Sequence, residues 1–226
     1  MKRRIALIGL GSFGRRILDE LLELDVELII IDRQEEVIDT YKDRVAEAYV
    51  MDVNNEALLE KMIHHHLDYA IVDLGEHLEA AILVTHHLHS IKAGKIIARA
   101  QSERQGGILR IIGADEIVYP PRDAVRAILP RLFSSRLQQF LRVGSGIGMA
   151  EVRVPPRFYG KPLVELRLRQ SAGINVVAIK NGEEGDYFFF APDYTFTEGD
   201  VVLVVGSDED IAVFAGLPKK ILRQAG

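Results

Sequence analysis

The chain of 226 residues contains no cysteine. A disulfide, a thiolate nucleophile and a cysteine-ligated metal are therefore excluded, which fits an intracellular protein. Long hydrophobic runs are missing as well: the longest, such as residues 201–205, have the length of a strand, whereas a membrane-spanning helix needs roughly 20 apolar residues. We expect a cytoplasmic protein without direct membrane insertion, so that any role at a membrane would depend on a partner.

Basic residues are in the minority, with 28 Lys and Arg against 33 Asp and Glu and a formal net charge of -5. Because proteins that bind nucleic acids usually carry a basic excess that neutralises phosphates, we do not expect DNA or RNA as the main partner. A content of 48% hydrophobic and 27% charged residues is typical of a folded globular protein. The length favours two domains.

The first 120 residues alternate between short apolar runs and longer stretches with helical three- and four-residue spacing. The apolar runs lie at 4–8, 27–31, 47–51, 69–73, 95–98 and 116–118. Six strands separated by helices predict a parallel, doubly wound sheet of the Rossmann type in an α/β domain.

The second half has a different pattern. An apolar stripe predicts a helix over 123–141, and the glycines in 143–148 predict a linker between domains. Strands are expected at 149–154, 174–179, 187–191 and 201–205, with helices near 162–168 and from Asp208, so the second domain is a small α+β domain. The expected division is 1–120 for the Rossmann-type domain, 121–145 for a crossover helix and linker, and 146–226 for the second domain.

A glycine loop follows the first expected strand and opens a helix. Gly9 makes the tight turn, Gly11 lets the backbone approach a phosphate, and Gly14 lets the helix pack on the strand. The helix N-terminus offers free N–H groups to the anion. Asp32 ends the second strand, where an acid accepts hydrogen bonds from ribose hydroxyls and disfavours the 2′-phosphate of NADP. The alternative is a glycine-rich turn without a ligand.

Three further side chains follow expected strands, at the sheet edge where ligands of open α/β sheets bind. Asp52 has the right place to accept from an adenine amino group, although capping of a helix that starts near Asn55 explains it equally well. Asp73 ends the fourth strand. Arg99 ends the fifth strand, where it either faces the phosphates of a ligand or is a surface residue.

The seven histidines lie in or beside two expected helices: His64, His65, His66, His77, His86, His87 and His89. Without an acid at ligand spacing, they favour a solvated helix surface over a metal site. The second domain has no histidine. This weakens the hypothesis of a dehydrogenase in which that domain supplies a His as acid/base catalyst.

Several segments together resemble the RCK (regulator of K⁺ conductance) family, the gating subunits of Ktr and Trk potassium transporters. These segments are 5–14, 72–75, 97–100 and 112–120, similar to the family's N-domain (TrkA-N), and 160–163, 173–179 and 199–206, similar to its C-domain (TrkA-C). The resemblance covers nearly the whole chain, and one domain of each kind is closer to the Ktr type.

The resemblance implies a homo-oligomer, with dimers assembling into an octameric ring on the inner face of the cell membrane, docked on an integral-membrane potassium-translocating subunit. It also implies an adenine-nucleotide sensor rather than an enzyme, with ATP or ADP as ligand and NAD(H) in some members. The helix over 123–141 matches the family's crossover helix, which packs on a neighbouring subunit; packing on its own domain is the alternative. The candidate binding residues are Gly9, Gly11, Ser12, Phe13, Gly14, Asp32, Arg33, Asp52, Val53, Asp73 and Arg99.

Two positions depart from Ktr-type members. Ser12 stands where many carry an Arg that reaches the terminal phosphate, and Pro121 stands where some carry a metal-binding Glu. In the second domain, Arg169, Ile174, Asn175 and Pro192 lie in segments that bind cyclic di-AMP in some relatives. The alternative is that they are apolar strand residues and a turn proline.

Two competing functions remain. One is a small NAD-dependent oxidoreductase with Tyr or Lys as the catalyst, and the other is a ligand-free scaffold.

Overall fold

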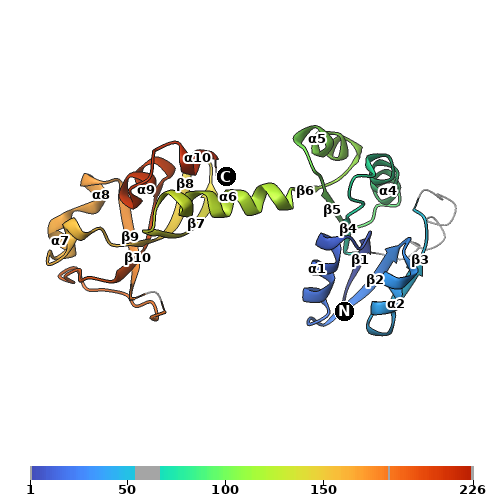
Figure 1. Ribbon diagram of the computed structural model, residues 1–226, viewed down its shortest axis with the longest axis horizontal. Helices are drawn as coiled ribbons and strands as arrows, with labels where there is room; N and C mark the ends of the chain where they lie inside the picture. Colours follow the sequence, from blue (N-terminus) through green and yellow to red (C-terminus); the bar gives the residue numbers. More distant parts are fainter. Residues whose placement is uncertain (1, 54–66, 183, 225–226) are drawn as a thin grey trace. The chain divides into compact units, whose positions relative to one another are not determined.

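The computed structural model describes residues 2–53, 67–182 and 184–224. The chain divides into two compact units, residues 1–121 and 122–226 (Figure 1). The first unit ends one residue after 120, the expected end of the Rossmann-type domain. The second begins earlier than the expected 146, because the residues between 122 and 145 belong to its helix and its sheet.

The first unit is built on a sheet of six strands. In chain order they are β1 (Arg3–Ile8), β2 (Val26–Asp32), β3 (Glu47–Val50), β4 (Tyr69–Val72), β5 (Lys95–Arg99) and β6 (Glu116–Val118). Every neighbouring pair is parallel, and the order across the sheet is β3-β2-β1-β4-β5-β6. This is the Rossmann order, so the predicted fold class is confirmed. The order reverses between β1 and β4, which makes their carboxyl ends the expected ligand site.

Helices cover both faces of this sheet. They are α1 (Ser12–Leu21), α2 (Glu35–Tyr41), continued by the short η1 (Lys42–Arg44), α4 (Leu78–Ser90) and α5 (Glu103–Ile112). Successive side chains of a strand point to opposite faces. In β1, Leu7 packs with α1 and α2, whereas Ile8 packs with α4 on the other face, and both are fully buried. Burial of both faces explains why these strands are nearly continuous apolar runs.

The second unit holds an antiparallel sheet in the order β7-β8-β10-β9. Its strands are β7 (Leu137–Gly144), β8 (Ile147–Arg153), β9 (Ile174–Asn181) and β10 (Asp200–Ser207). Its helices are α6 (Pro120–Phe133), η2 (Pro156–Phe158), α7 (Leu163–Leu166), α8 (Leu168–Ser171), α9 (Asp208–Ala215) and α10 (Ile221–Gln224). One face of the sheet packs on α9 around the fully buried Phe196 and Phe214. The predicted α+β architecture is therefore confirmed.

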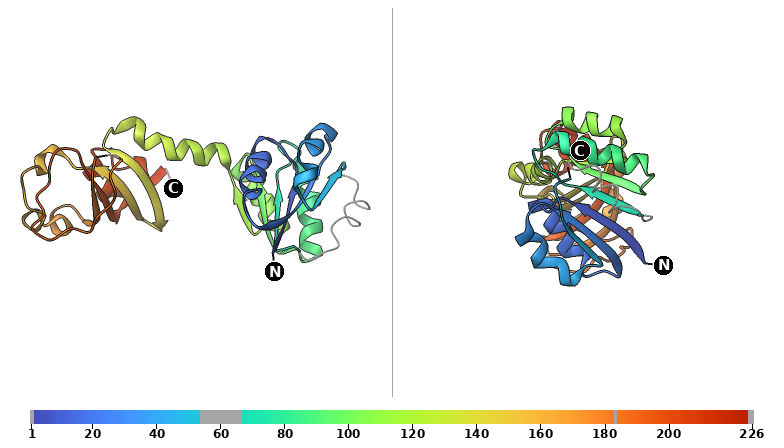
Figure 2. Two further views of the ribbon diagram at one scale, coloured as in Figure 1. Left: turned by 90° about the horizontal axis from the view of Figure 1, so that it is seen from below. Right: turned by 90° about the vertical axis from the view of Figure 1, so that its right-hand side faces the viewer.

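The predicted helix over 123–141 is wrong in its second half. α6 ends at Phe133, and Figure 2 shows it as one continuous helix; residues 137–144 form β7. Leu137 and Phe140, three positions apart, both pack in the core, which imitates the spacing of a helix. The cause is a bulge: the pairing with β8 shifts between Leu137 and Gln139, and the extra residue returns Phe140 to the core face.

Two further local predictions are corrected. Residues 143–148 are not a linker but the end of a hairpin, in which Gly144 pairs with Ile147 across a turn, and Gly146 has the positive φ of 77° that such turns require. The expected strand at 187–191 is reduced to a single bridge between Phe188 and Ile179. The remaining predicted elements agree with the structure to within a few residues.

Candidate functional site

A pocket of about 250 Å³ lies at the carboxyl ends of β1, β2, β3 and β4 in the first unit. Seven of the residues expected to bind a ligand line it: Gly9, Gly11, Asp32, Arg33, Asp52, Val53 and Asp73. The strand order brings them together, because the ends of neighbouring parallel strands meet at one edge of the sheet. This volume is slightly below the size range of small-molecule sites, roughly 300–1,000 Å³.

The glycine loop is tightly packed against the end of β4. Gly9 has φ of 88°, and a Cβ there would lie 2.7 Å from the carbonyl carbon of Asp73. A Cβ at Gly14 would overlap the carbonyl oxygen of Gly9. Any larger residue at either position would separate α1 from β1 and β4, so these two glycines are required by the close approach of backbone to backbone.

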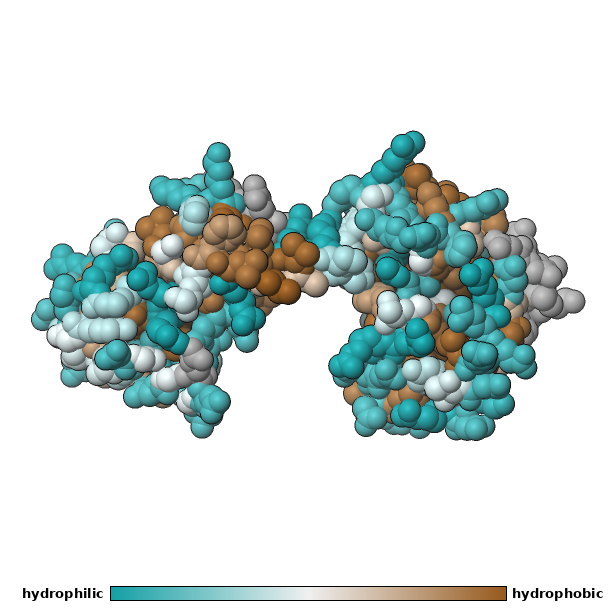
Figure 3. Space-filling model, viewed as in Figure 1, coloured by the Kyte–Doolittle hydropathy of each residue, from teal (hydrophilic) through white to brown (hydrophobic). Residues whose placement is uncertain are grey.

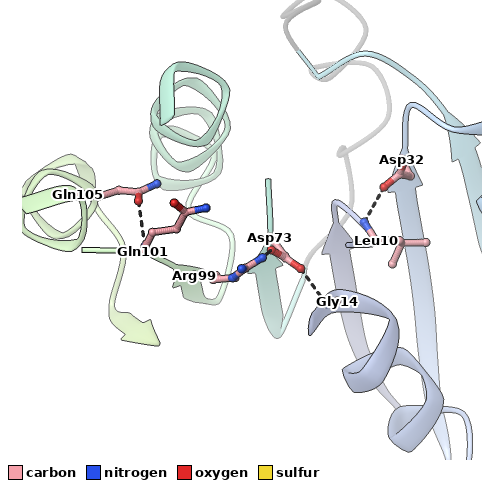
Figure 4. A network of polar contacts seen from close by, with 7 residues as sticks. All are labelled: Leu10, Gly14, Asp32, Asp73, Arg99, Gln101 and Gln105. Carbon is pink, nitrogen blue, oxygen red and sulfur yellow. Dashed lines mark hydrogen bonds and ion pairs between the residues drawn. The ribbon is translucent and has the colours of Figure 1, made fainter. Parts of the chain in front are cut away.

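Asp32 supports the same loop from the end of β2. Its Oδ2 accepts a hydrogen bond from the backbone N–H of Leu10 at 2.6 Å (Figure 4), and its Oδ1 accepts one from the N–H of Gln34 at 2.9 Å. Each carboxylate oxygen can accept a further hydrogen bond. Asp32 is half-buried and lines the pocket, so its carboxylate can orient the loop and accept from a ligand hydroxyl at the same time.

Asp73 lies at the centre of a second polar network. Its Oδ2 accepts from the backbone N–H of Gly14, in the first turn of α1, at 2.8 Å. Its Oδ1 accepts from Nη1 of Arg99 at 2.7 Å. Figure 4 shows the carboxylate between the start of α1 and the Arg99 side chain. The Asp73 side chain is 1% exposed and that of Arg99 is 18% exposed. Arg99 is therefore not a simple surface residue, and the negative group that it contacts is Asp73.

Four of the expected site residues do not line the pocket: Ser12, Phe13, Gly14 and Arg99. Gly14 and Arg99 are nevertheless joined to it through Asp73. The residues that line the pocket but were not expected from the sequence include Leu10, Arg15, Gln34, Leu74, Gly75 and His77. Each lies within four residues of a predicted position, Gly11, Asp32 or Asp73, and this closeness in the sequence is the signal that could have found them.

The charges at the pocket are mixed. Asp32, Asp52 and Asp73 contribute carboxylates, while Arg15 and Arg33 contribute exposed guanidinium groups on α1 and after β2. The carboxylate of Asp73 is already engaged by Arg99 and by the start of α1. Among the described residues that line the pocket, the guanidinium groups are those of Arg15 and Arg33. Guanidinium groups are well suited to phosphate, because they donate two parallel hydrogen bonds.

The remaining predicted positions have separate outcomes. Asp52 is exposed and lines the pocket, and the helix expected near Asn55 lies outside the described residues, as do His64, His65 and His66. The expectation of a solvated histidine surface is wrong for His87, which is 6% exposed on α4. No group of three or more His, Asp or Glu in the described part of the chain is arranged to hold a metal ion.

The cyclic di-AMP candidates are spread over the second unit. Ile174 is fully buried in the core at the start of β9, whereas Arg169, Asn175 and Pro192 are exposed. For Ile174, the structure therefore agrees with the alternative of an apolar strand residue.

A glycine loop, a helix N-terminus, an acid at the end of β2 and a pocket at the switch point define a Rossmann-type domain with a candidate nucleotide site, joined to a small antiparallel domain. The TrkA-N domain model matches residues 5–120, and the TrkA-C domain model matches residues 149–217. The chain belongs to the RCK family, as a protein with one TrkA-N and one TrkA-C domain, and the resemblance found in the sequence is confirmed.

A relative that aligns with nearly the whole chain supports this assignment. The chain is 33% identical to the Ktr system potassium uptake protein C of Bacillus subtilis (strain 168), over 95% of this chain and 96% of the relative. The pairing of the two domain types is therefore shared along nearly the full length of both proteins.

Solved structures agree in fold. The crystal structure of the GsuK RCK domain superimposes with a TM-score of 0.63 and 16% identity, over 96% of this chain and 48% of that chain. The GsuK channel bound to NAD superimposes with a TM-score of 0.64, over 96% of this chain and 40% of that one. The chain thus spans about half of these solved chains or less. None of the helices within the described ranges is long and apolar enough to cross a membrane.

Proposed function

We propose that the chain is a nucleotide-sensing regulatory subunit of a Ktr/Trk-type potassium uptake system. The observation that carries this proposal is the pocket at the switch point, lined by the glycine loop and by Asp32, which supports that loop. The chain is also similar over 95% of its length to a Ktr system potassium uptake protein. The role is binding rather than catalysis: the nucleotide shifts the equilibrium between conformations of the assembly.

The ligand is an adenine nucleotide, ATP or ADP, or the dinucleotide NAD(H). Asp32 accepts from the ribose hydroxyls, the start of α1 and the guanidinium groups of Arg15 and Arg33 attract the phosphates, and the apolar side chains of Met51 and Val53 contact the base beside Asp52. The GsuK channel, part of which has the same fold, has been solved bound to NAD, a ligand that contains the same adenosine diphosphate unit.

The partners are a second copy of the chain and an integral-membrane potassium-translocating subunit at the inner face of the membrane. α6 exposes an apolar stripe of Val125, Ile128, Leu132 and Phe133, each more than half exposed, and Figure 3 shows apolar residues gathered over this helix. Exposed apolar patches of this kind mark protein interfaces. The stripe supports a contact between copies of the chain through α6, and we propose that the resulting dimers assemble into a ring of eight.

Binding can be tested by isothermal titration of the purified chain with ATP, ADP, NAD and NADH. We expect at least one ligand to bind with a Kd in the micromolar range or below, and Asp32→Asn to weaken it by roughly 10-fold, since a neutral amide accepts more weakly than a carboxylate. Asn retains an oxygen for the Leu10 N–H, so this contact with the glycine loop is kept, whereas the hydrogen bond from the Gln34 N–H is lost. Asp68→Asn is the control, because Asp68 precedes β4 at the opposite sheet edge. Absence of binding by all four ligands would refute the proposal.

The transport role needs its own measurement. Potassium flux into vesicles that contain the potassium-translocating subunit of the same system is compared with and without this chain, at saturating ATP and at saturating ADP. We expect the chain to change the flux and the two nucleotides to change it to different extents. Flux that is insensitive to the chain, or steady consumption of NADH with a small carbonyl substrate, would contradict a purely regulatory role.

A further inference from the structure

The buried carboxylate of Asp73 occupies the region of the pocket to which a ligand phosphate is attracted. It accepts from the Gly14 N–H in the first turn of α1, and a Cβ built on Gly11 would lie 3.1 Å from its Oδ2. The free N–H groups and positive dipole end of a helix attract anions within its first turn. The anion that the fold itself supplies here is the Asp73 side chain.

Asp73 also engages Arg99. The guanidinium donates from Nη1 to Oδ1 of Asp73 at 2.7 Å, and the pair is held at low exposure between β4 and β5. Two groups with affinity for phosphate, the Gly14 N–H and the Arg99 guanidinium, therefore bind a carboxylate of the protein. A ligand phosphate that approaches this end of the pocket meets the negatively charged carboxylate of Asp73. The two groups that could bind the phosphate, the Gly14 N–H and the Arg99 guanidinium, already bind this carboxylate.

We propose that Asp73 is a specificity-determining residue that lowers the affinity of the pocket for each additional ligand phosphate. This inference rests on the nucleotide binding proposed above. Repulsion between like charges grows with the number of charges, so Asp73 disfavours ATP more than ADP, and ADP more than AMP. Asp32 lies at the far side of the glycine loop, on β2, so the adenosine end of the ligand is recognised independently of Asp73.

The test is calorimetric titration of the full chain and of Asp73→Asn with AMP, ADP and ATP. Asn is isosteric and retains an oxygen that accepts from the Gly14 N–H, whereas the charge is removed and Arg99 is released. We expect about 10-fold tighter binding of ATP, an intermediate gain for ADP and a gain below about 3-fold for AMP.

Asp68→Asn is the matched control, because Asp68 precedes the same strand at its other end and also accepts from a backbone N–H, that of Arg4, at 2.7 Å. It removes the same charge away from the pocket and is expected to leave all three affinities unchanged. Asp73→Ser is a second variant in case Asp73→Asn does not fold, since serine is a good acceptor for N–H groups at a helix start.

The outcomes separate this inference from the function on which it rests. Equal affinities of Asp73→Asn and the unsubstituted chain for all three nucleotides, or an equal gain for AMP and ATP, overturn the role of Asp73 and leave nucleotide sensing intact. Binding that appears only in Asp73→Asn supports the role of Asp73 and refutes sensing of these nucleotides by the native chain. No binding by any of the proteins overturns both.

Discussion

Two adjacent glycines of α5 provide a sharp test of the packing in the first unit. A Cβ at Gly106 would overlap the hydroxyl oxygen of Tyr119 and lie 2.8 Å from its Cζ, whereas among the described residues no atom lies within 4 Å of a Cβ at Gly107. Tyr119 is 7% exposed, and its hydroxyl donates to Glu103 at 3.2 Å, so the ring has no free space into which to move. The same substitution should therefore have opposite effects at neighbouring positions.

The magnitudes follow from two contributions. Replacement of Gly by Ala in a helix interior stabilises by about 0.8–1 kcal/mol, and this gain is common to both variants. Overpacking of a filled core costs about 1–3 kcal/mol and applies only to Gly106→Ala. We expect Gly107→Ala to raise the free energy of unfolding of the first unit by up to about 1 kcal/mol, and Gly106→Ala to lie about 1–3 kcal/mol below Gly107→Ala.

Urea-dependent hydrogen exchange, followed by mass spectrometry on peptides from α5 and β6, reports the stability of the first unit separately from that of the second. Comparison of the two variants cancels the helix propensity, so the difference isolates the collision with Tyr119. If Gly106→Ala is as stable as Gly107→Ala, within about 0.5 kcal/mol, the close packing of α5 on Tyr119 is refuted.

Three predictions concern the second unit. Lys180→Met should destabilise it by about 3–5 kcal/mol in chemical denaturation, because it removes the cation that neutralises the buried carboxylate of Glu151, and the double variant with Glu151→Gln should recover most of the loss. Burial and the neighbouring Glu151 raise the pKa of Tyr187 to about 12, so an ultraviolet titration of the folded chain should show Tyr187 ionising well above the ordinary tyrosine value of about 10. Since the folded form holds that proton more tightly, the stability that Tyr187 contributes is present below pH 10 and is lost as the pH rises towards 12; ionisation near pH 10 in the folded chain would contradict this. Ser207→Ala should cost about 1 kcal/mol in thermal unfolding, because the Ser207 hydroxyl accepts from the N–H of Asp210 at the start of α9, whereas Ser145→Ala in the β7–β8 turn should have no effect.

Most of the fold could be predicted because both domains follow strong local rules. The strands of the first unit are short apolar runs buried on two faces, and the helices between them have one apolar side. The second unit was harder, because its sheet contains bulges. The extra residue between Leu137 and Gln139 turned a strand into a pattern with helical spacing, and a single bridge at Phe188 did not suffice for the strand expected at 187–191.

The candidate site could be predicted in part. Gly9 is required by its positive φ, Gly14 by a close backbone contact, and Asp32 ends a strand. These requirements act within a short stretch of chain, so the positions of the three residues follow from their spacing in the sequence. Asp73 and Arg99 were recognised only as residues at strand ends. Their partners are on other elements, and pairing between β1, β4 and β5 decides which groups meet.

The sequence by itself determined a Rossmann-type first domain, an antiparallel second domain and a glycine loop with an acid after the next strand, because periodicity and steric limits act over a few residues. Only the tertiary structure decided what the loop contacts. The order of the strands brings the Asp73 carboxylate to the N-terminus of α1 and the Arg99 guanidinium to that carboxylate, and such long-range contacts depend on how strands pair rather than on their spacing in the chain.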